Sequence, residues 1–200
     1  MIFTSITPEA FDHKNIPNDI HEMNDHIKNL LVNAPPSHEI PFDVLQDIRR
    51  QGGGLLAFQP YSDRAENRQV GDGDQKVTIR IFNHDSPDFI YMHIHGGGHC
   101  IGAADMQDQS LEKVSKELNC VVVSVEYRLA PTNPYPAAPD DCETAAVWLI
   151  ENSKKEFSTE KIIIGGESAG ANLSAVTLQR LKNKNMLEPF KGANLIYGSY

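Results

Sequence analysis

The feature that most constrains the fold of this chain is a glycine–x–serine–x–glycine motif that directly follows an apolar run. The run occupies residues 161–164, and the motif Gly-Glu-Ser-Ala-Gly occupies residues 166–170. A strand that turns sharply into a helix needs glycine where the two segments pass too closely for side chains. Such a turn exposes Ser168 at a helix N-terminus, where free backbone N–H groups favour negative charge. The pattern predicts that Ser168 is a nucleophile. The alternative interpretation of the same pattern is an ordinary glycine-rich turn.

A second motif, His-Gly-Gly-Gly at residues 95–98, ends another apolar run at residues 89–94. Three successive glycines after a buried strand let backbone N–H groups approach a ligand without interference from side chains, as an oxyanion hole requires. A flexible turn is the alternative, but it would not account for the preceding histidine or for the downstream serine motif. Together the two motifs indicate a nucleophile and a set of oxyanion donors in one site.

With these motifs, the chain resembles the hormone-sensitive-lipase-like esterases of the α/β-hydrolase fold. The resemblance covers about residues 75–200 and is carried by four segments, at residues 95–98, 126–131, 134–138 and 165–173. It implies an α/β fold with a mainly parallel sheet, helices on both faces and an N-terminal helical cap. Glu126 and Thr132 stand where the family usually has Asp and Glu. Both lie in a segment that braces the fold, so the expected chemistry is unaffected.

The resemblance also implies roles for individual residues. Ser168 corresponds to the nucleophile, and the backbone N–H groups of Gly97, Gly98 and Ala169 correspond to the oxyanion hole. His95 corresponds to a residue that supports the glycine loop through side-chain hydrogen bonds. The implied activity is that of a serine carboxylesterase, hydrolysing small-molecule esters with short to medium acyl chains through an acyl-enzyme, without a cofactor. The alternatives are a non-catalytic, receptor-like protein that binds a small molecule, and a peptidase or amidase.

The expected partners of the nucleophile are absent from the sequence that follows it. In this fold the triad runs in the order Ser, then Asp or Glu, then His. After Ser168 there is no Asp and no His, and Glu188 is the only side-chain carboxylate. We therefore expect this chain to be the first part of a longer or split enzyme, or a truncated and inactive form. The missing groups would come from beyond Tyr200 or from a second polypeptide or oligomer that completes the fold.

Composition narrows the class of protein further. The chain has 200 residues, of which 40% are hydrophobic, enough for one sizeable core. A net charge of −9 argues against nucleic acid and anionic membranes as partners. Three cysteines without a C-x-x-C motif suggest reduced thiols in a cytoplasmic protein. Neither a signal peptide nor an apolar stretch of membrane-spanning length is recognisable.

The chain divides into two expected parts. We expect residues 1–54 to form a helical cap segment, because apolar residues recur there at helical spacing and the glycines at residues 52–54 suit a hinge. The alternative is that these amphipathic helices only pack against the domain. Residues 55–200 form the N-terminal portion of an α/β-hydrolase domain, because strand and helix patterns alternate there. Residues 71–74 predict a hairpin turn rather than a calcium loop. The predicted strands span residues 77–82 (half-buried), 89–94, 120–125, 161–164 and 193–197, and the predicted helices span residues 106–118, 140–151 and 168–181.

Two further groups of residues suggest other functions. His93, His95 and His99 form an H-x-H-x-x-x-H pattern that could hold a metal, although no cysteine or carboxylate ligand follows at suitable spacing, and we expect none. Arg128 beside Glu126 could bind a substrate carboxylate, with a buried structural ion pair as the preferred interpretation.

Overall fold

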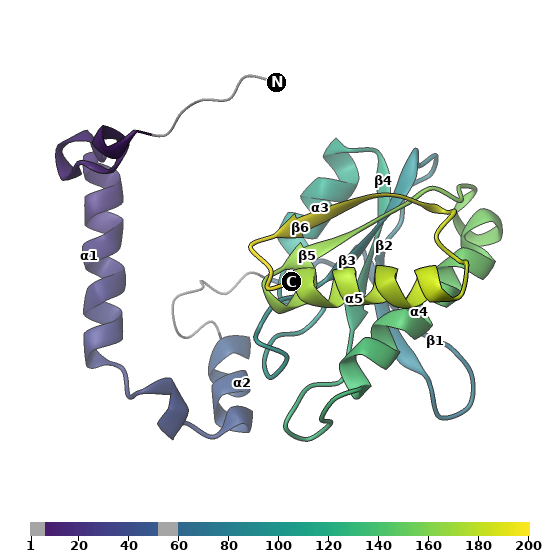
Figure 1. Cartoon of the computed structure of the whole chain (residues 1–200), viewed down its shortest axis with the longest axis horizontal. Coiled ribbons are helices and arrows are strands. Elements are labelled where there is room, and N and C mark those ends of the chain that lie inside the picture. The colour runs from purple at the N-terminus through teal and green to yellow at the C-terminus, as the bar shows by residue number, and fades with distance from the viewer. Residues whose placement is uncertain (1–6, 52–59) are drawn as a thin grey trace.

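The computed structural model describes residues 7–51 and 60–200, so the predicted glycine hinge at residues 52–54 lies outside the described residues. The N-terminal part is helical, as predicted. Helix α1 stands apart from the sheet in Figure 1, and its apolar side chains Ile20, Met23 and Leu31 are exposed. The elements of this part are η1 (Pro8–Phe11), η2 (His13–Asn15), α1 (Asn18–Asn33), η3 (Ser37–Glu39) and α2 (Phe42–Arg50).

Residues 60–200 form a six-stranded mixed sheet with the order β1-β2-β4-β3-β5-β6. Strands β4, β3, β5 and β6 run parallel, and β1 and β2 are antiparallel to their neighbours. The parallel strands end at one edge of the sheet, where ligands bind in open α/β folds. The strands are β1 (Ala65–Val70), β2 (Val77–Phe82), β3 (Phe89–Ile94), β4 (Cys120–Glu126), β5 (Ile162–Glu167) and β6 (Phe190–Ile196).

Helices cover both faces of this sheet (Figure 1). Alternate side chains of a strand point to opposite faces, so each central strand contributes to two cores. On one face Tyr91 of β3 clusters with Leu111 of α3. On the other face Met92 of β3 clusters with Leu149 of α4 and Leu173 of α5. These helices are α3 (Asp108–Glu117), α4 (Ala137–Phe157) and α5 (Ala169–Asn183).

The predicted strands and helices are present, with several differences in their limits. β1 was not predicted, and it pairs with β2 across the turn at residues 71–76, which confirms the hairpin. β2 is almost entirely buried rather than half-buried, because helices cover both of its faces. α4 begins at Ala137, three residues before the predicted start of this helix at residue 140. Its Pro139 lies in the first helical turn, where a missing N–H leaves no hydrogen bond unmade.

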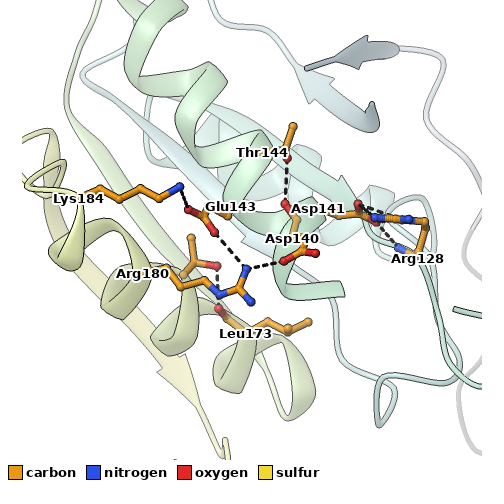
Figure 2. Close-up of polar contacts among 9 residues, drawn as sticks. Arg128, Asp140, Asp141, Glu143, Thr144, Leu173, Arg180 and Lys184 are labelled. Carbon is orange, nitrogen blue, oxygen red and sulfur yellow. Dashed lines mark hydrogen bonds and ion pairs between the residues drawn. The ribbon is translucent and has the colours of Figure 1, made fainter. Parts of the chain in front are cut away.

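Charged residues join α4 to α5 and to the end of β4 (Figure 2). Arg180 of α5 bridges Asp140 at 2.7 Å and Glu143 at 3.0 Å, both on α4. Lys184 also pairs with Glu143. Because this network lies between two helices that cover the same sheet face, it fixes their relative placement.

The expected ion pair of Arg128 has a different partner. Its guanidinium contacts Asp141, with Nη2 2.8 Å from Oδ1, and its side chain is 45% exposed rather than buried. Glu126 instead accepts a hydrogen bond from the backbone N–H of Ala104. The two side chains are alternate residues of an extended segment, but α4 offers Arg128 a nearer carboxylate.

None of the helices in the described part of the chain is both long and apolar enough to cross a membrane.

Candidate active site

Ser168 occupies the sharp turn between β5 and α5. Its backbone has φ 53° and ψ −115°, a sparsely populated conformation for a residue with a side chain. A Cβ on Gly166 would lie 1.9 Å from the carbonyl oxygen of Ile94, and one on Gly170 would lie 1.8 Å from it. Both motif glycines are thus required where the turn crosses the end of β3. The predicted strand–turn–helix geometry and backbone strain are confirmed.

The glycine loop leaves β3 directly beside this turn. Gly97 has φ 122° and Gly98 has φ 62°, both in the region that favours glycine. The carbonyl of Gly97 accepts hydrogen bonds from the backbone of Cys100 and Ile101, which closes the loop on itself. Within residues 7–51 and 60–200, no hydrogen bond is donated by the backbone N–H groups of Gly97, Gly98 or Ala169. These three donors remain available to a ligand.

The loop and the serine turn touch at Gly96. A Cβ on Gly96 would lie 2.7 Å from the carbonyl oxygen of Glu167 and 3.5 Å from the Cβ of Ser168. A cleft of about 420 Å³ opens at this junction, and Gly96, Gly97 and Ser168 line it together. Gly98 and Ala169 are not among its lining residues, although each directly follows one. The cleft is completed by Arg49, His95, Gly102, Met106, Gln107, Ser110, Glu167 and Tyr197.

A larger hollow of about 830 Å³ lies elsewhere, between the β1–β2 hairpin and α4. Its lining includes Gly71, Thr144 and Trp148 and none of the predicted site residues. We place the candidate site at the smaller cleft because chemistry depends on the groups present rather than on volume.

His95 supports the glycine loop from beneath. Its Nδ1–H donates to the carbonyl of Gly96 at 2.8 Å, and its ring stacks on Tyr127 with the centroids 4.1 Å apart. The Tyr127 hydroxyl also donates to the carbonyl of His95 at 2.8 Å. Burial lowers the pKa of His95 to about 4, so the ring is neutral near pH 7. Sequence reasoning gave Tyr127 no role, although it lies in one of the segments that carry the family resemblance.

The three histidines of the H-x-H-x-x-x-H pattern are not brought together around a common point. His93 is buried with its two ring nitrogens facing Ser124 and Glu167. The His95 ring is hydrogen-bonded to the carbonyl of Gly96 in the glycine loop, and His99 does not line the cleft. In the described part of the chain, no three His, Cys, Asp or Glu side chains form a possible metal site.

The N-terminal helical part reaches the cleft through α2. The Gln46 side chain donates to the carbonyl of Gly102 at 2.7 Å and accepts from its N–H at 2.8 Å. Arg49, one turn further along α2, lines the cleft. Neither residue was predicted, because a single glutamine or arginine on an amphipathic helix carries no distinguishing pattern.

Known proteins resemble this chain in sequence. The carboxylic ester hydrolase LipN of Mycobacterium tuberculosis is 40% identical over 96 residues, which are 47% of this chain and 26% of that protein. An arylesterase of Saccharolobus solfataricus is 33% identical over 138 residues, which are 66% of this chain and 45% of that protein. The chain thus spans less than half of the length of these curated relatives.

Solved structures resemble it in fold. The ester-hydrolase EH1AB1 from the metagenome of Lake Arreo superposes with a TM-score of 0.75 at 22% identity, covering 92% of this chain and 60% of that one. An arylesterase structure gives a TM-score of 0.74 at 24% identity, covering 89% and 59% of the two chains.

The family assignment rests on the domain that carries the serine turn and the glycine loop. The family described as alpha/beta hydrolase fold matches residues 91–200, which is more than half of the sequence. This segment begins inside β3, contains all of β4, β5 and β6, and includes both motifs of the cleft. The chain therefore belongs to the α/β-hydrolase fold family.

Proposed function

We propose that this chain carries the nucleophile and the oxyanion hole of a carboxylic ester hydrolase. The Ser168 hydroxyl attacks the ester carbonyl, and the negative oxygen is held by the N–H groups of Gly97, Gly98 and Ala169. The alcohol leaves, and water then hydrolyses the acyl-enzyme. A cleft of about 420 Å³ is compatible with acyl chains of short to medium length.

The observation that supports this proposal is the strained serine facing a loop of free backbone donors. Ser168 adopts φ 53° and lines one cleft with Gly96 and Gly97. Strain of this kind persists where the surrounding structure enforces it, often at catalytic positions. Relatives named carboxylic ester hydrolase, carboxylesterase and arylesterase agree with this assignment.

The general base is expected to come from outside these 200 residues. His93 has both ring nitrogens engaged, and His95 is buried with Nδ1 engaged and its pKa lowered to about 4. Neither ring is suited to accept the serine proton near neutral pH. We propose that a histidine and its orienting carboxylate are supplied by further sequence or by a second polypeptide.

Residues 1–54 are proposed to act as a cap over this cleft. The support comes from α2, where Gln46 is hydrogen-bonded to Gly102 and Arg49 lines the cleft. The substrate is proposed to be a small-molecule ester.

Labelling with a fluorophosphonate, followed by peptide mass spectrometry, tests the nucleophile. In a form that also holds the missing histidine and carboxylate, such a probe should modify Ser168, and Ser168→Ala should abolish both labelling and hydrolysis of a chromogenic short-chain ester. Ser174→Ala is the matched control, because this serine of α5 is buried and donates to the carbonyl of Gly170. Turnover that survives Ser168→Ala would contradict the assignment.

The isolated chain should turn over esters only weakly, because removal of triad partners leaves the residual catalysis of the oxyanion hole and of binding. Strong turnover by the pure chain would contradict an external base and would point to His99.

A further inference from the structure

Beneath the serine turn lies a row of polar side chains that the proposed chemistry does not use. His93 of β3 is 1% exposed, and Ser124 of β4 is fully buried. Glu167 ends β5, and Gln107 precedes the first residue of α3. Three strands and the residue before α3 thus meet in one hydrogen-bonded group, which includes the residue that directly precedes Ser168.

The sheet register explains how they meet. His93 is paired with Ser124 on one neighbouring strand and with Gly165 on the other. Side chains alternate along a strand, so Glu167, two residues after Gly165, shares the face of His93. The His93 Nδ1 is 2.9 Å from the Ser124 hydroxyl, and its Nε2 is 3.3 Å from each carboxylate oxygen of Glu167. The Gln107 amide donates to Glu167 at 3.1 Å.

The chemistry of these groups decides where the His93 proton lies. Burial raises the pKa of the Glu167 carboxyl, but the hydrogen bond and the charge interaction with His93, together with the hydrogen bond from Gln107, outweigh burial and leave the pKa below its usual range. An ionised carboxylate only accepts hydrogen bonds, so Nε2 of His93 must carry a hydrogen. This hydrogen bond is charge-assisted, and the two oxygens of a part-buried carboxylate share it at 3.3 Å each.

Glu167 connects this row to both halves of the cleft. It directly precedes Ser168, and its carbonyl oxygen is so close to Gly96 that a Cβ there would lie 2.7 Å away. A displacement of Glu167 therefore moves the nucleophile relative to the glycine loop. Misplacement of a reacting group by about 1 Å can lower a rate by about 100-fold.

We propose that His93 is a positioning residue, whose Nε2–H holds the Glu167 side chain and thereby sets Ser168 against the glycine loop. The inference rests on the proposed function, because it assigns His93 a part in the reactivity of Ser168. Ser124 orients the ring from β4, and Gln107 holds the carboxylate from α3.

Two amide substitutions separate this role from simple packing. His93→Gln places an N–H donor near the position of Nε2, whereas His93→Asn places one near Nδ1 and cannot reach Glu167. In the form that holds the missing histidine and carboxylate, we expect His93→Asn to lower the maximal rate of fluorophosphonate labelling of Ser168 by about 100-fold, and His93→Gln to stay within about fivefold. The half-saturating probe concentration should not change. Equal losses in the two variants, at equal melting temperatures, would overturn the proposal.

A second pair of variants tests the same hydrogen bond by changing its acceptor, Glu167. Glu167→Gln keeps an acceptor for Nε2–H and should label nearly as fast as the unaltered chain, whereas Glu167→Met should lose about as much as His93→Asn. Tyr91→Phe is the control, because Tyr91 shares the strand and face of His93 but bonds to Asn194. If His93→Asn does not fold, this pair decides, and equal rates in Glu167→Gln and Glu167→Met overturn the proposal.

A measurement independent of reactivity distinguishes failure of this inference from failure of the proposed function. In ¹⁵N-histidine-labelled protein, long-range ¹H–¹⁵N correlation should show Nε2 of His93 protonated near pH 7 and disturbed in Glu167→Met but not in Glu167→Gln. A His93 protonated only at Nδ1 overturns the inference, even where Ser168 is labelled. If Ser168 is not labelled even in the form that holds the missing histidine and carboxylate, the proposed function fails, and so does the role of His93 in reactivity.

Discussion

At the scale of single residues, the adjacent glycines Gly97 and Gly98 are required for different reasons. A Cβ on Gly97 would lie 1.9 Å from the carbonyl oxygen of Ile101, whereas one on Gly98 would meet nothing within 4 Å. Gly97→Ala should therefore destabilise the fold by about 3 kcal/mol or more, and Gly98→Ala by about 1 kcal/mol, the cost of a left-handed backbone alone. Urea unfolding of the two variants measures this difference, and equal costs would contradict the described loop.

Burial of His95 makes stability depend on pH. Its pKa is about 4 in the folded state against about 6.5 for a histidine in the unfolded chain, so the unfolded chain binds the extra proton. Stability from this residue is fully present above about pH 6.5 and is lost as the pH falls towards 4, by about 3 kcal/mol in all.

The variant His95→Asn tests this dependence, because its amide can still donate to the carbonyl of Gly96 but does not titrate. Unfolding free energies of the variant and the unaltered chain should diverge between about pH 4 and 6.5. His38→Asn is the control, since its side chain is 81% exposed. Parallel curves for the His95→Asn and unaltered proteins would contradict a buried neutral ring.

At the scale of elements, α2 and the glycine loop are joined by the two hydrogen bonds of Gln46 to the backbone of Gly102. Gln46→Ala should raise the hydrogen-exchange rate of the Gly102 amide by about fivefold, since one such bond contributes about 1 kcal/mol. Asp47→Ala, at an exposed position on the same helix, should leave that rate unchanged. An unchanged rate in Gln46→Ala would argue against the proposed cap arrangement.

The central strands could be predicted from sequence because their apolar runs are continuous, as is typical of strands covered on both faces. β1 reads Ala-Glu-Asn-Arg-Gln-Val and lies at the edge of the sheet, so its polar side chains conceal it. α4 starts among prolines, three residues before the start predicted from the sequence. Edge strands and helix starts depend on neighbours in space, and these neighbours are not adjacent in sequence.

The parts of the site that depend on local sequence could be predicted, whereas those that depend on contacts between distant segments could not. Ser168 and the glycine loop could be located because glycine spacing records local backbone requirements. Gln46, Gln107 and Tyr127 could not, because each acts through a contact between distant segments. Arg128 was assigned the wrong partner for this reason, since Asp141 is brought to it by α4.

At the scale of the whole molecule, β6 lies at the open edge of the sheet, and its residues 191–195 are exposed. Unpaired N–H and C=O groups on such an edge favour pairing with another chain. We expect the 200-residue chain to self-associate or to bind a second polypeptide there. Light scattering after size exclusion should show a larger species that Ala193→Lys reduces to a monomer. Asn183→Lys adds the same charge away from the edge and should not, and a monomeric unaltered chain would contradict the expectation.

The strained backbone at Ser168 presents the hydroxyl but lowers the stability of the fold. Glycine adopts φ 53° and ψ −115° without the steric cost that serine bears, a difference of about 1–3 kcal/mol. Ser168→Gly should therefore melt at a higher temperature than either the unaltered chain or Ser168→Ala. If a descendant of this chain no longer needed its hydroxyl, random mutation would reach a more stable protein by a single change at this position. Under the proposed function, the hydroxyl of Ser168 is therefore kept at a cost in the stability of the fold.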